Sequence, residues 1–367
     1  MKLSNFFTNP YRWLAAASLI TVLSGCNNGF VYEDLAECRP DRRVRLSFTR
    51  NMAFEEKRQE EVTHAKVFAF DDEGLLADFN VSEGQNLINS DYTIPLNLEQ
   101  DVNYRFITWC GSDQDAFAIN ADPTETMSRT DGDLDGAGSD IMEGLGATVA
   151  NENGIIKTEL DPIHYGNGAH AFTKMTGTEE YTIDLTKDTN TIIVYLRKVL
   201  NMNGLEVYIE DKNDELDFNN GIANEDVHIK YYPVSVETNV DCPTGDGNGG
   251  YTGEYVKGTK LVFNTSRLFD PADVGNTSNL ARIVINETRP DGSKSSVLDT
   301  PLVKDILVKS KPHVMAPDGE HWNTKSDQEY LDREDTYEAV FTLEDYAMIV
   351  VHINGWRVVI QNVNIGQ

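Results

Sequence analysis

The sequence predicts an all-β fold of two tandem β-sandwich domains. Short runs of alternating apolar and polar residues recur along most of the chain, and turn-forming residues separate them. Alternation with a period of two is typical of half-buried strands. No run of helical periodicity is long enough to predict strand–helix–strand units. The chain of 367 residues is also too long for one hydrophobic core of ordinary size, which favours two domains.

The N-terminus predicts a signal peptide of the lipoprotein type. Lys2 and Arg12 supply positive charge before the apolar run Trp13–Leu23. This run is shorter than the roughly 20 apolar residues that span a bilayer, so we interpret it as a cleaved signal. The box Leu23-Ser24-Gly25-Cys26 resembles the lipobox of bacterial lipoproteins. By that resemblance residues 1–25 are removed and Cys26 carries the lipid; the alternative is an ordinary signal peptide with an incidental cysteine.

The first sandwich is predicted over residues 38–188, after a tether over residues 26–37. Its expected strands cover residues 44–48, 66–70, 92–98, 104–110, 155–160 and 181–185. Between residues 113 and 154 the pattern fades into acidic and glycine-rich sequence, which we interpret as a long insertion or loop. Glycines also punctuate the segment from His164 to His170, which we interpret as a loop between strands.

The second sandwich is predicted over residues 189–367. Its expected strands cover residues 191–196, 204–209, 227–236, 260–263, 281–285, 303–308, 337–343, 348–353 and 357–363. The pair Asn354-Gly355 is typical of the tight turn of a β-hairpin and joins the last two of these strands.

Charge and hydropathy limit the partners. The net charge of −29 argues against nucleic acid, because phosphate repels an acidic surface. After Leu23 the sequence holds no apolar stretch long enough to span a bilayer, so lipid is the expected membrane attachment.

The remaining cysteines are Cys38, Cys110 and Cys242. A lipoprotein reaches an oxidising compartment, where disulfides persist. Among three thiols, at most one intramolecular disulfide can form. Cys38 opens the first domain and Cys110 ends an apolar strand, so a Cys38–Cys110 bond would tie the N-terminus to the first sandwich. A Cys38–Cys242 bond and buried free thiols are the alternatives.

One acidic segment has part of a calcium-binding pattern. Asp131, Asp133 and Asp135 alternate as in the first half of an EF-hand loop. Met142 stands where the loop needs its bidentate Glu, and the flanks lack helices. A solvated acidic loop is therefore favoured over a calcium site, and no other cofactor is expected.

Known catalytic motifs are missing from the sequence. Neither H-E-x-x-H, G-x-S-x-G nor a P-loop occurs. Paired carboxylates carry no information in a chain with 60 acidic residues. We therefore expect the protein not to be an enzyme.

Several segments occur in the order of a known family. They are Cys26, Cys38-Arg39-Pro40, Val44-Arg45-Leu46-Ser47-Phe48, Val67-Phe68-Ala69-Phe70-Asp71 with Gly74, Tyr104-Arg105-Phe106-Ile107-Thr108-Trp109, and Ile353-Asn354-Gly355-Trp356. Together the segments resemble the FimB-type fimbrial anchor subunits of Bacteroidales, which include the minor-fimbria anchors and belong to the FimA-like pilin superfamily. The resemblance covers nearly the whole chain after Cys26.

The resemblance implies two transthyretin-like β-sandwiches in an outer-membrane lipoprotein, exposed at the cell surface at the base of a type V pilus. Its partners would be fimbrial shaft pilins, joined by strand exchange, and the membrane, joined by acyl chains such as palmitate at Cys26. In strand exchange, main-chain hydrogen bonds supply affinity and side-chain pockets supply fit. The sequence does not identify the exchanged strand.

Two other roles are weighed against the anchor. One is a shaft or tip pilin: shaft pilins of the superfamily mature by cleavage after an arginine, and this chain offers Arg39, Arg42, Arg43, Arg45 and Arg50 in that region. We interpret these arginines instead as side chains on an exposed strand edge. The other rival is a glycan-binding β-sandwich lipoprotein, for which Trp322 and Tyr330 are the candidate exposed aromatic residues.

Overall fold

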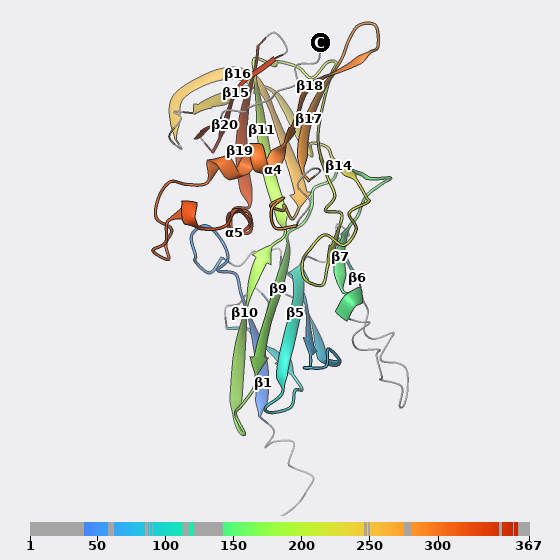
Figure 1. Cartoon of the computed structure of the whole chain (residues 1–367), viewed down its shortest axis with the longest axis vertical. Coiled ribbons are helices and arrows are strands. Elements are labelled where there is room, and N and C mark those ends of the chain that lie inside the picture. The colour runs from blue at the N-terminus through green and yellow to red at the C-terminus, as the bar shows by residue number, and fades with distance from the viewer. Residues whose placement is uncertain are drawn as a thin grey trace, which may run out of the picture.

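The computed structural model describes residues 40–57, 62–84, 87, 89, 91–112, 117–120, 142–245, 248, 250–274, 280–344, 347–354 and 356–358. These residues form an elongated molecule built almost wholly of β-strands (Figure 1). The predicted all-β fold is confirmed. One large sheet occupies the end of the molecule that contains β1, and two further sheets occupy the other end.

The N-terminal half is a seven-stranded sheet in the order β3-β2-β5-β9-β10-β1-β4. Its strands are β1 (Asp41–Ser47), β2 (His64–Phe70), β3 (Leu76–Glu83), β4 (Ile94–Leu96), β5 (Asn103–Gly111), β9 (Ile163–Ala171) and β10 (Thr178–Lys187). The two outer strands come together, because the Asn97 backbone N–H donates to Asp78 Oδ2 at 2.6 Å and Asn80 Nδ2 donates to the Pro95 carbonyl at 3.2 Å. The sheet therefore curls around its own core.

Alternation along the strands builds that core. In β1, Val44 and Leu46 face inward and are buried, whereas Arg43 and Arg45 face the other side and stay half-exposed. Inward-facing residues of the other strands, such as Phe106, complete the same hydrophobic cluster.

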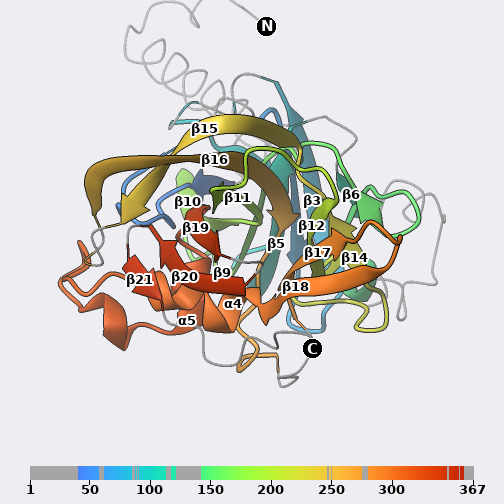
Figure 2. The ribbon, with the colours of Figure 1, turned by 90° about the horizontal axis from the view of Figure 1, so that it is seen from above.

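A six-stranded and a five-stranded sheet make the C-terminal half. The six-stranded sheet, in the order β15-β16-β11-β19-β20-β21, contains β11 (Thr189–Arg197), β15 (Ser235–Gly245), β16 (Tyr251–Ser266), β19 (Thr336–Glu344), β20 (Ala347–Ile353) and β21 (Trp356–Val358). The five-stranded sheet, in the order β18-β17-β12-β14-β8, contains β8 (Ile155–Ile156), β12 (Leu205–Asp211), β14 (Ile229–Tyr231), β17 (Arg282–Thr288) and β18 (Lys294–Pro301). Seen from above, the long strands β15 and β16 curve along one side of this half (Figure 2).

A small sheet lies between the two halves. It contains β6 (Phe117–Asn120), β7 (Gly146–Val149) and β13 (Glu215–Asp217). The chain passes from β10 to β11 at Asp188, but β7 and β8 come earlier in the sequence and pair with β13 and β14. A third hydrophobic cluster combines residues of both halves, including Trp109 and Leu216, so the halves share packed surface.

Short helical segments follow β18. They are α4 (Leu302–Asp305), η4 (Leu307–Ser310), η5 (Trp322–Thr324) and α5 (Asp327–Leu331). The strand predicted over residues 303–308 is therefore wrong. Leu302, Val303, Ile306 and Leu307 are all buried, and this spacing places them on one face of a helical turn. A short apolar run suits a strand and a helical turn equally, and tertiary packing decides.

The loop predicted from His164 to His170 is also wrong, because this segment is most of β9, which pairs with β5 and β10. Its glycines allow close packing. A Cβ atom at Gly166 would lie 2.6 Å from Leu185 Cδ2, and a Cβ at Gly168 would collide with the Tyr181 hydroxyl. Glycine within a strand can mark a close approach of a neighbour, and here the neighbours are core side chains.

Candidate functional site

The first strand after the tether lies inside the seven-stranded sheet. β1 pairs in parallel with β10 from Asp41 to Ser47, and antiparallel with β4 from Arg42 to Val44. The interpretation of an exposed strand edge is therefore wrong. A strand that is hydrogen-bonded on both sides must leave the sheet before a protease can bind it, so the folded protein protects the peptide bonds after Arg42 and Arg43.

The arginines of this region have different environments. Arg43 Nε lies 2.6 Å from Asp41 Oδ2, and Arg45 Nη2 lies 2.6 Å from Glu180 Oε2 on β10. Arg50 Nη2 lies 3.6 Å from Asp332 Oδ2, in the C-terminal half. Arg42 faces the core side of β1 and is only 6% exposed. Arg39 lies outside the described residues.

Most of the site residues predicted from the sequence also lie outside the described residues: Cys26, Cys38, Asp131, Asp133 and Asp135. Lipidation, the Cys38–Cys110 disulfide and the calcium site stay predictions. Cys110 is buried in the first core and Cys242 is buried in β15, where burial raises the pKa of its thiol. Within the described residues, no three His, Cys, Asp or Glu side chains gather as metal ligands.

Trp322 and Tyr330, the aromatic residues considered for glycan binding, are buried. They are 3% and 1% exposed, and their ring centroids lie 6.2 Å apart in an edge-to-face contact. The Tyr330 hydroxyl lies 3.1 Å from Ser310 Oγ. These two residues belong to the core of the C-terminal half, so neither offers a stacking surface to a sugar.

The C-terminal half presents outer strands to solvent. β15 borders the six-stranded sheet, and β18 borders the five-stranded sheet. The pairing of β15 with β16 shifts between Thr238 and Val240, around Asn239 at φ 58°, and Pro243 follows. Bulges and proline hinder uncontrolled pairing of an edge strand. The four residues from Ser235 to Thr238 are regular and exposed, so they offer the more open part of this edge.

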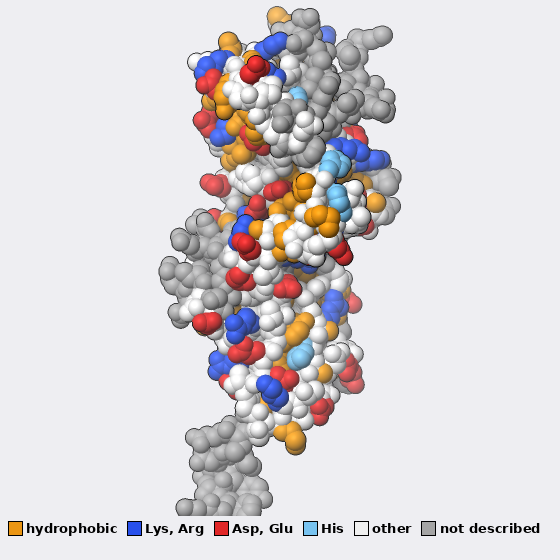
Figure 3. All heavy atoms as spheres, turned by 90° about the vertical axis from the view of Figure 1, so that its left-hand side faces the viewer, with side chains coloured by type: hydrophobic (Ala, Val, Ile, Leu, Met, Phe, Trp, Pro, Cys, Tyr) orange, Lys and Arg blue, Asp and Glu red, His pale blue; other side chains and the backbone are white. Residues whose placement is uncertain are grey.

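The face of the molecule in Figure 3 shows how charge is distributed. Acidic and basic side chains alternate over it, and apolar side chains lie in small groups between them. Val314 and Met315, in the loop between η4 and η5, are 56% and 58% exposed. Among the described residues, no helix has the length and apolar character needed to cross a membrane.

A buried ionic cluster lies where the chain leaves β10 and passes into the C-terminal half. Arg267 Nη2 lies 2.8 Å from Asp332 Oδ1 and 3.0 Å from Oδ2, and Arg267 Nε lies 3.7 Å from Asp188 Oδ1. Asn220 Nδ2 donates to Asp188 Oδ1 at 2.9 Å. Because these residues come from four distant segments, the sequence offered no local signal for the cluster, which we call the junction cluster.

Burial dominates the electrostatics of the junction cluster. Asp188 is fully buried, and desolvation raises the pKa of its carboxyl to about 7, although Arg267 acts in the opposite direction. Within the described chain, Asp188 Oδ2 has no hydrogen-bond partner. Arg267 and Asp332 thus tie two segments of the C-terminal half together, and Arg267 links them to Asp188, where the chain crosses between the halves. Asp188 is the member whose ionisation is opposed by burial at neutral pH.

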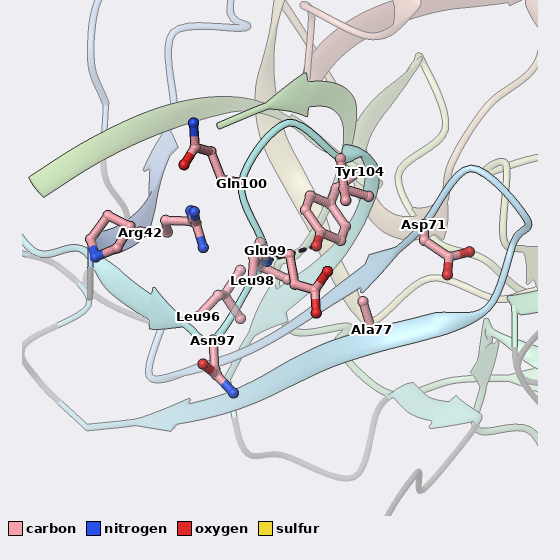
Figure 4. Close-up of a pocket in the computed structure, with 11 residues that line it drawn as sticks. Arg42, Asp71, Ala77, Leu96, Asn97, Leu98, Glu99, Gln100 and Tyr104 are labelled. Atoms are coloured by element: carbon pink, nitrogen blue, oxygen red, sulfur yellow. Dashed lines mark hydrogen bonds between the residues drawn. The ribbon is translucent and has the colours of Figure 1, made fainter. Parts of the chain in front are cut away.

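A pocket of about 650 Å³ opens at the other end of the seven-stranded sheet, where β1 begins (Figure 4). Its lining includes Arg42, Leu96, Leu98, Glu99, Gln100 and Tyr104. The Glu99 backbone N–H donates to the Tyr104 hydroxyl at 2.8 Å and shapes the loop between β4 and β5. The mouth of a curled sheet is a common place for ligand sites. We call this cavity the mouth pocket.

The sequence pattern of one protein family matches the chain over residues 35–362. That family is described as the fimbrillin-A associated anchor proteins Mfa1 and Mfa2. The chain belongs to this family. The resemblance to fimbrial anchor subunits predicted from the sequence is thereby confirmed, and the match supports a role as a fimbrial subunit. No curated protein matches the chain.

Solved structures share the fold of this family member. A protein from Bacteroides thetaiotaomicron described as an adhesin is 21% identical, with a TM-score of 0.68 over 89% of this chain and 100% of that one. Another from the same organism, described as polysaccharide-binding, is 21% identical, with a TM-score of 0.65 over 88% and 99%. The fimbrial anchor protein Mfa2 of Porphyromonas gingivalis is 17% identical, with a TM-score of 0.60 over 88% and 100%.

Proposed function

We propose that this protein is a lipid-anchored fimbrial anchor of the bacterial outer membrane, not an enzyme. In this proposal, lipid on Cys26 holds the chain to the membrane, and an open edge of the C-terminal half joins the first pilin of the shaft. The single observation that carries the proposal is the position of β1, paired on both sides directly after the tether. It is supported by membership of a family of fimbrial anchor proteins.

The pairing of β1 suits a strand that bears load. A pull on the tether acts at Asp41, the first residue of β1, and is directed along the strand. The hydrogen bonds to β10 and β4 lie across that direction, so they resist together and do not open one after another. Each bond contributes only about 1 kcal/mol, but extraction of β1 must break all of them and also expose Val44 and Leu46.

Strand addition at the C-terminal half is the proposed link to the pilin. An added strand forms main-chain hydrogen bonds with an open edge, and its alternate side chains enter pockets. The regular part of β15, Ser235–Thr238, is one acceptor on the described surface. β18 is another, although Lys294 begins it and Pro301 ends it. β1, the strand that follows the tether in the chain, lies in one half of the elongated molecule and these edges lie in the other, as a link between a membrane and a shaft requires (Figure 1).

The decisive experiment replaces Cys26 with alanine in the native bacterium. We expect Cys26→Ala to release most fimbriae into the medium, because the lipid is lost and the fold is not affected. Pilin in the cell and medium fractions is measured by immunoblot, with Cys242→Ala as the matched control for loss of a thiol far from the tether. Fimbriae that stay on the Cys26→Ala cells would show that Cys26 is not the anchor.

The intact mass of the protein from outer membranes separates anchor from shaft or tip pilin. We expect a chain that begins at Cys26 and carries acyl groups. A lipid-free chain that begins after one of the arginines between Arg39 and Arg50 would indicate proteolytic maturation and a polymerising pilin. The calcium site at Asp131, Asp133 and Asp135 remains a separate proposal, tested by the calcium content of the purified protein.

Glycan binding is the weaker alternative. One similar structure is described as polysaccharide-binding, but the two aromatic residues that would have favoured this function here are buried. Pull-down of pilins with this protein, compared with its retention on polysaccharide columns, distinguishes the two functions.

A further inference from the structure

We propose that the mouth pocket binds a zwitterionic phosphate group of the phosphoethanolamine class, with the phosphate at Arg42 and the ammonium group at Glu99. The observation behind this proposal is a buried arginine, Arg42, that forms no ion pair among the described residues. Arg42 is 6% exposed and lines the pocket. Its Nε is buried and has no hydrogen-bond acceptor in the described part of the chain.

The neighbours of Arg42 show that this lack of a partner is specific. Arg43 and Arg45 are each within 2.6 Å of a carboxylate, and both are far more exposed than Arg42. A buried guanidinium is costly when it makes no hydrogen bond. Its planar fork binds phosphate through two parallel hydrogen bonds. An anion that enters the mouth pocket would therefore remove a penalty that the folded protein otherwise carries.

A second donor supports an anion that has several acceptor oxygens. The Tyr104 hydroxyl accepts a hydrogen bond from the Glu99 backbone N–H, so its own hydrogen is available to donate. Tyr104 and Arg42 line the same cavity. A phosphate has enough oxygens to accept from both the guanidinium and the hydroxyl.

The opposite side of the mouth pocket is acidic. Figure 4 shows Arg42 on one side and the carboxylates of Glu99 and Asp71 on the other, with Leu98 between. Asp71 Oδ1 accepts from the Glu73 and Leu75 backbone N–H groups at 3.0 and 2.9 Å. Glu99 is exposed, and no side-chain hydrogen bond or ion pair engages it within the described residues. Glu99 is therefore the carboxylate available to an ammonium group.

The size and position of the pocket leave two sources for the ligand. A volume of about 650 Å³ exceeds that of a head group alone and leaves room for a glycerol ester. The ligand is thus either a free phosphoethanolamine compound or the head group of a membrane lipid. The lipid source rests on the proposed function, because anchoring at Cys26 would keep Pro40, at the pocket, within roughly 50 Å of the bilayer. Binding of the free compound does not rest on it.

The first test is calorimetric titration of the detergent-solubilised full-length protein with O-phosphoethanolamine. Inorganic phosphate and ethanolamine serve as the two half-ligands. We expect O-phosphoethanolamine to bind at least tenfold more tightly than either. Absence of binding would overturn the proposal, and equal affinity for inorganic phosphate would overturn the role of Glu99.

Three variants assign the contacts. Arg42→Met should abolish binding of O-phosphoethanolamine. Arg43→Met removes the adjacent arginine on the opposite face of β1, so it should bind like the wild type. Glu99→Gln, at an exposed position that the fold does not need, should reduce affinity to that for inorganic phosphate. Thermal unfolding of each variant verifies its fold. Unchanged binding by Arg42→Met, or an equal loss in Arg43→Met, would contradict the assignment.

Vesicles distinguish the sources. The unlipidated Cys26→Ala protein is floated with vesicles of phosphatidylcholine, with and without phosphatidylethanolamine. If the lipid head group is the ligand, flotation requires phosphatidylethanolamine and is lost in Arg42→Met. Binding of the free compound without flotation would overturn the lipid source alone. Failure of Cys26→Ala to release fimbriae would contradict the anchor function without affecting the titration.

Discussion

Two buried arginines at opposite ends of the N-terminal half differ in how their charge is compensated. Arg267, in the junction cluster, contacts Asp332 and Asp188 at distances between 2.8 and 3.7 Å. Arg42, in the mouth pocket, has no ion pair among the described residues, and its Nε lacks an acceptor. Burial alone therefore does not give an arginine a structural role. A paired arginine holds segments together, whereas an unpaired arginine beside a cavity is available to a ligand.

The largest effect should come from breaking the paired arginine. Arg267→Met removes the buried cation of the junction cluster and leaves Asp332 with Arg50 alone, 3.6 Å away, and loss of one partner of a buried pair costs about 3–5 kcal/mol. We expect the free energy of unfolding in urea to fall by about that amount. A loss below about 1 kcal/mol would show that the junction cluster does not stabilise the fold.

A smaller, pH-dependent effect should come from Asp188. Its pKa is raised to about 7 in the folded state, against 3.8 as the ordinary value, so the folded protein binds a proton between these values and the unfolded chain does not. The stability that Asp188 contributes is present below about pH 4 and is lost as the pH rises through about 7. Each pH unit in this window changes the free energy of unfolding by up to about 1.4 kcal/mol.

Asp188→Asn, which resembles the protonated side chain, should remove the part of this pH dependence that comes from Asp188, whereas Asp211 and Glu334, whose pKa values burial also raises to about 7, keep their contributions. Urea unfolding of wild type and variant at pH 5 and pH 8 is the measurement, and the wild type should be the less stable protein at pH 8. Burial lowers the pKa of His164 to about 3, so His164 destabilises the folded state as the pH falls below about 6.5. Because wild type and Asp188→Asn both contain His164, the difference in their free energies of unfolding at one pH does not include the effect of His164. An identical pH dependence in both proteins would show that Asp188 titrates normally.

The smallest effect should come from the unpaired arginine. Arg42→Met replaces the arginine with an apolar side chain of similar length and so removes a buried charge that has no ion pair among the described residues. We expect stability to stay unchanged or to rise by up to about 1 kcal/mol, as substitutions at functional positions often do. The variant is measured beside Arg267→Met under the same conditions. If both variants lost equal stability, Arg42 would be structural and the contrast between the two arginines would fail.

Local alternation predicted much of the fold because each sheet buries one face of its strands. Val44, Leu46 and Phe48 alternate in the sequence and are buried in the structure. The errors occurred where local pattern is ambiguous. In β9, Gly166 and Gly168 suggested a loop, but they accommodate the side chains of β10. At residues 303–308, an apolar run suited both a strand and the helical turns that are present.

The candidate sites were less predictable. The role of Arg42 depends on which face of β1 it occupies and on what surrounds that face, and one sequence shows only that arginines are numerous there. The junction cluster combines Asn220, Arg267 and Asp332 with Asp188, and nothing in their spacing predicts that they meet. Buried aromatic residues such as Trp322 show the converse, because their exposure is set by neighbours distant in sequence.

By itself, the sequence determined the fold class, the family and the expected attachment at Cys26, since alternation, motif order and a lipobox are local properties of a chain. Only the tertiary structure decided that β1 lies between β10 and β4, that Trp322 is core, and that one arginine is paired and another is not. The physical reason is that pairing and burial depend on contacts between segments far apart in the chain. Strand β1 pairs with β10, which lies more than a hundred residues later in the chain, and no local sequence pattern predicts that pairing.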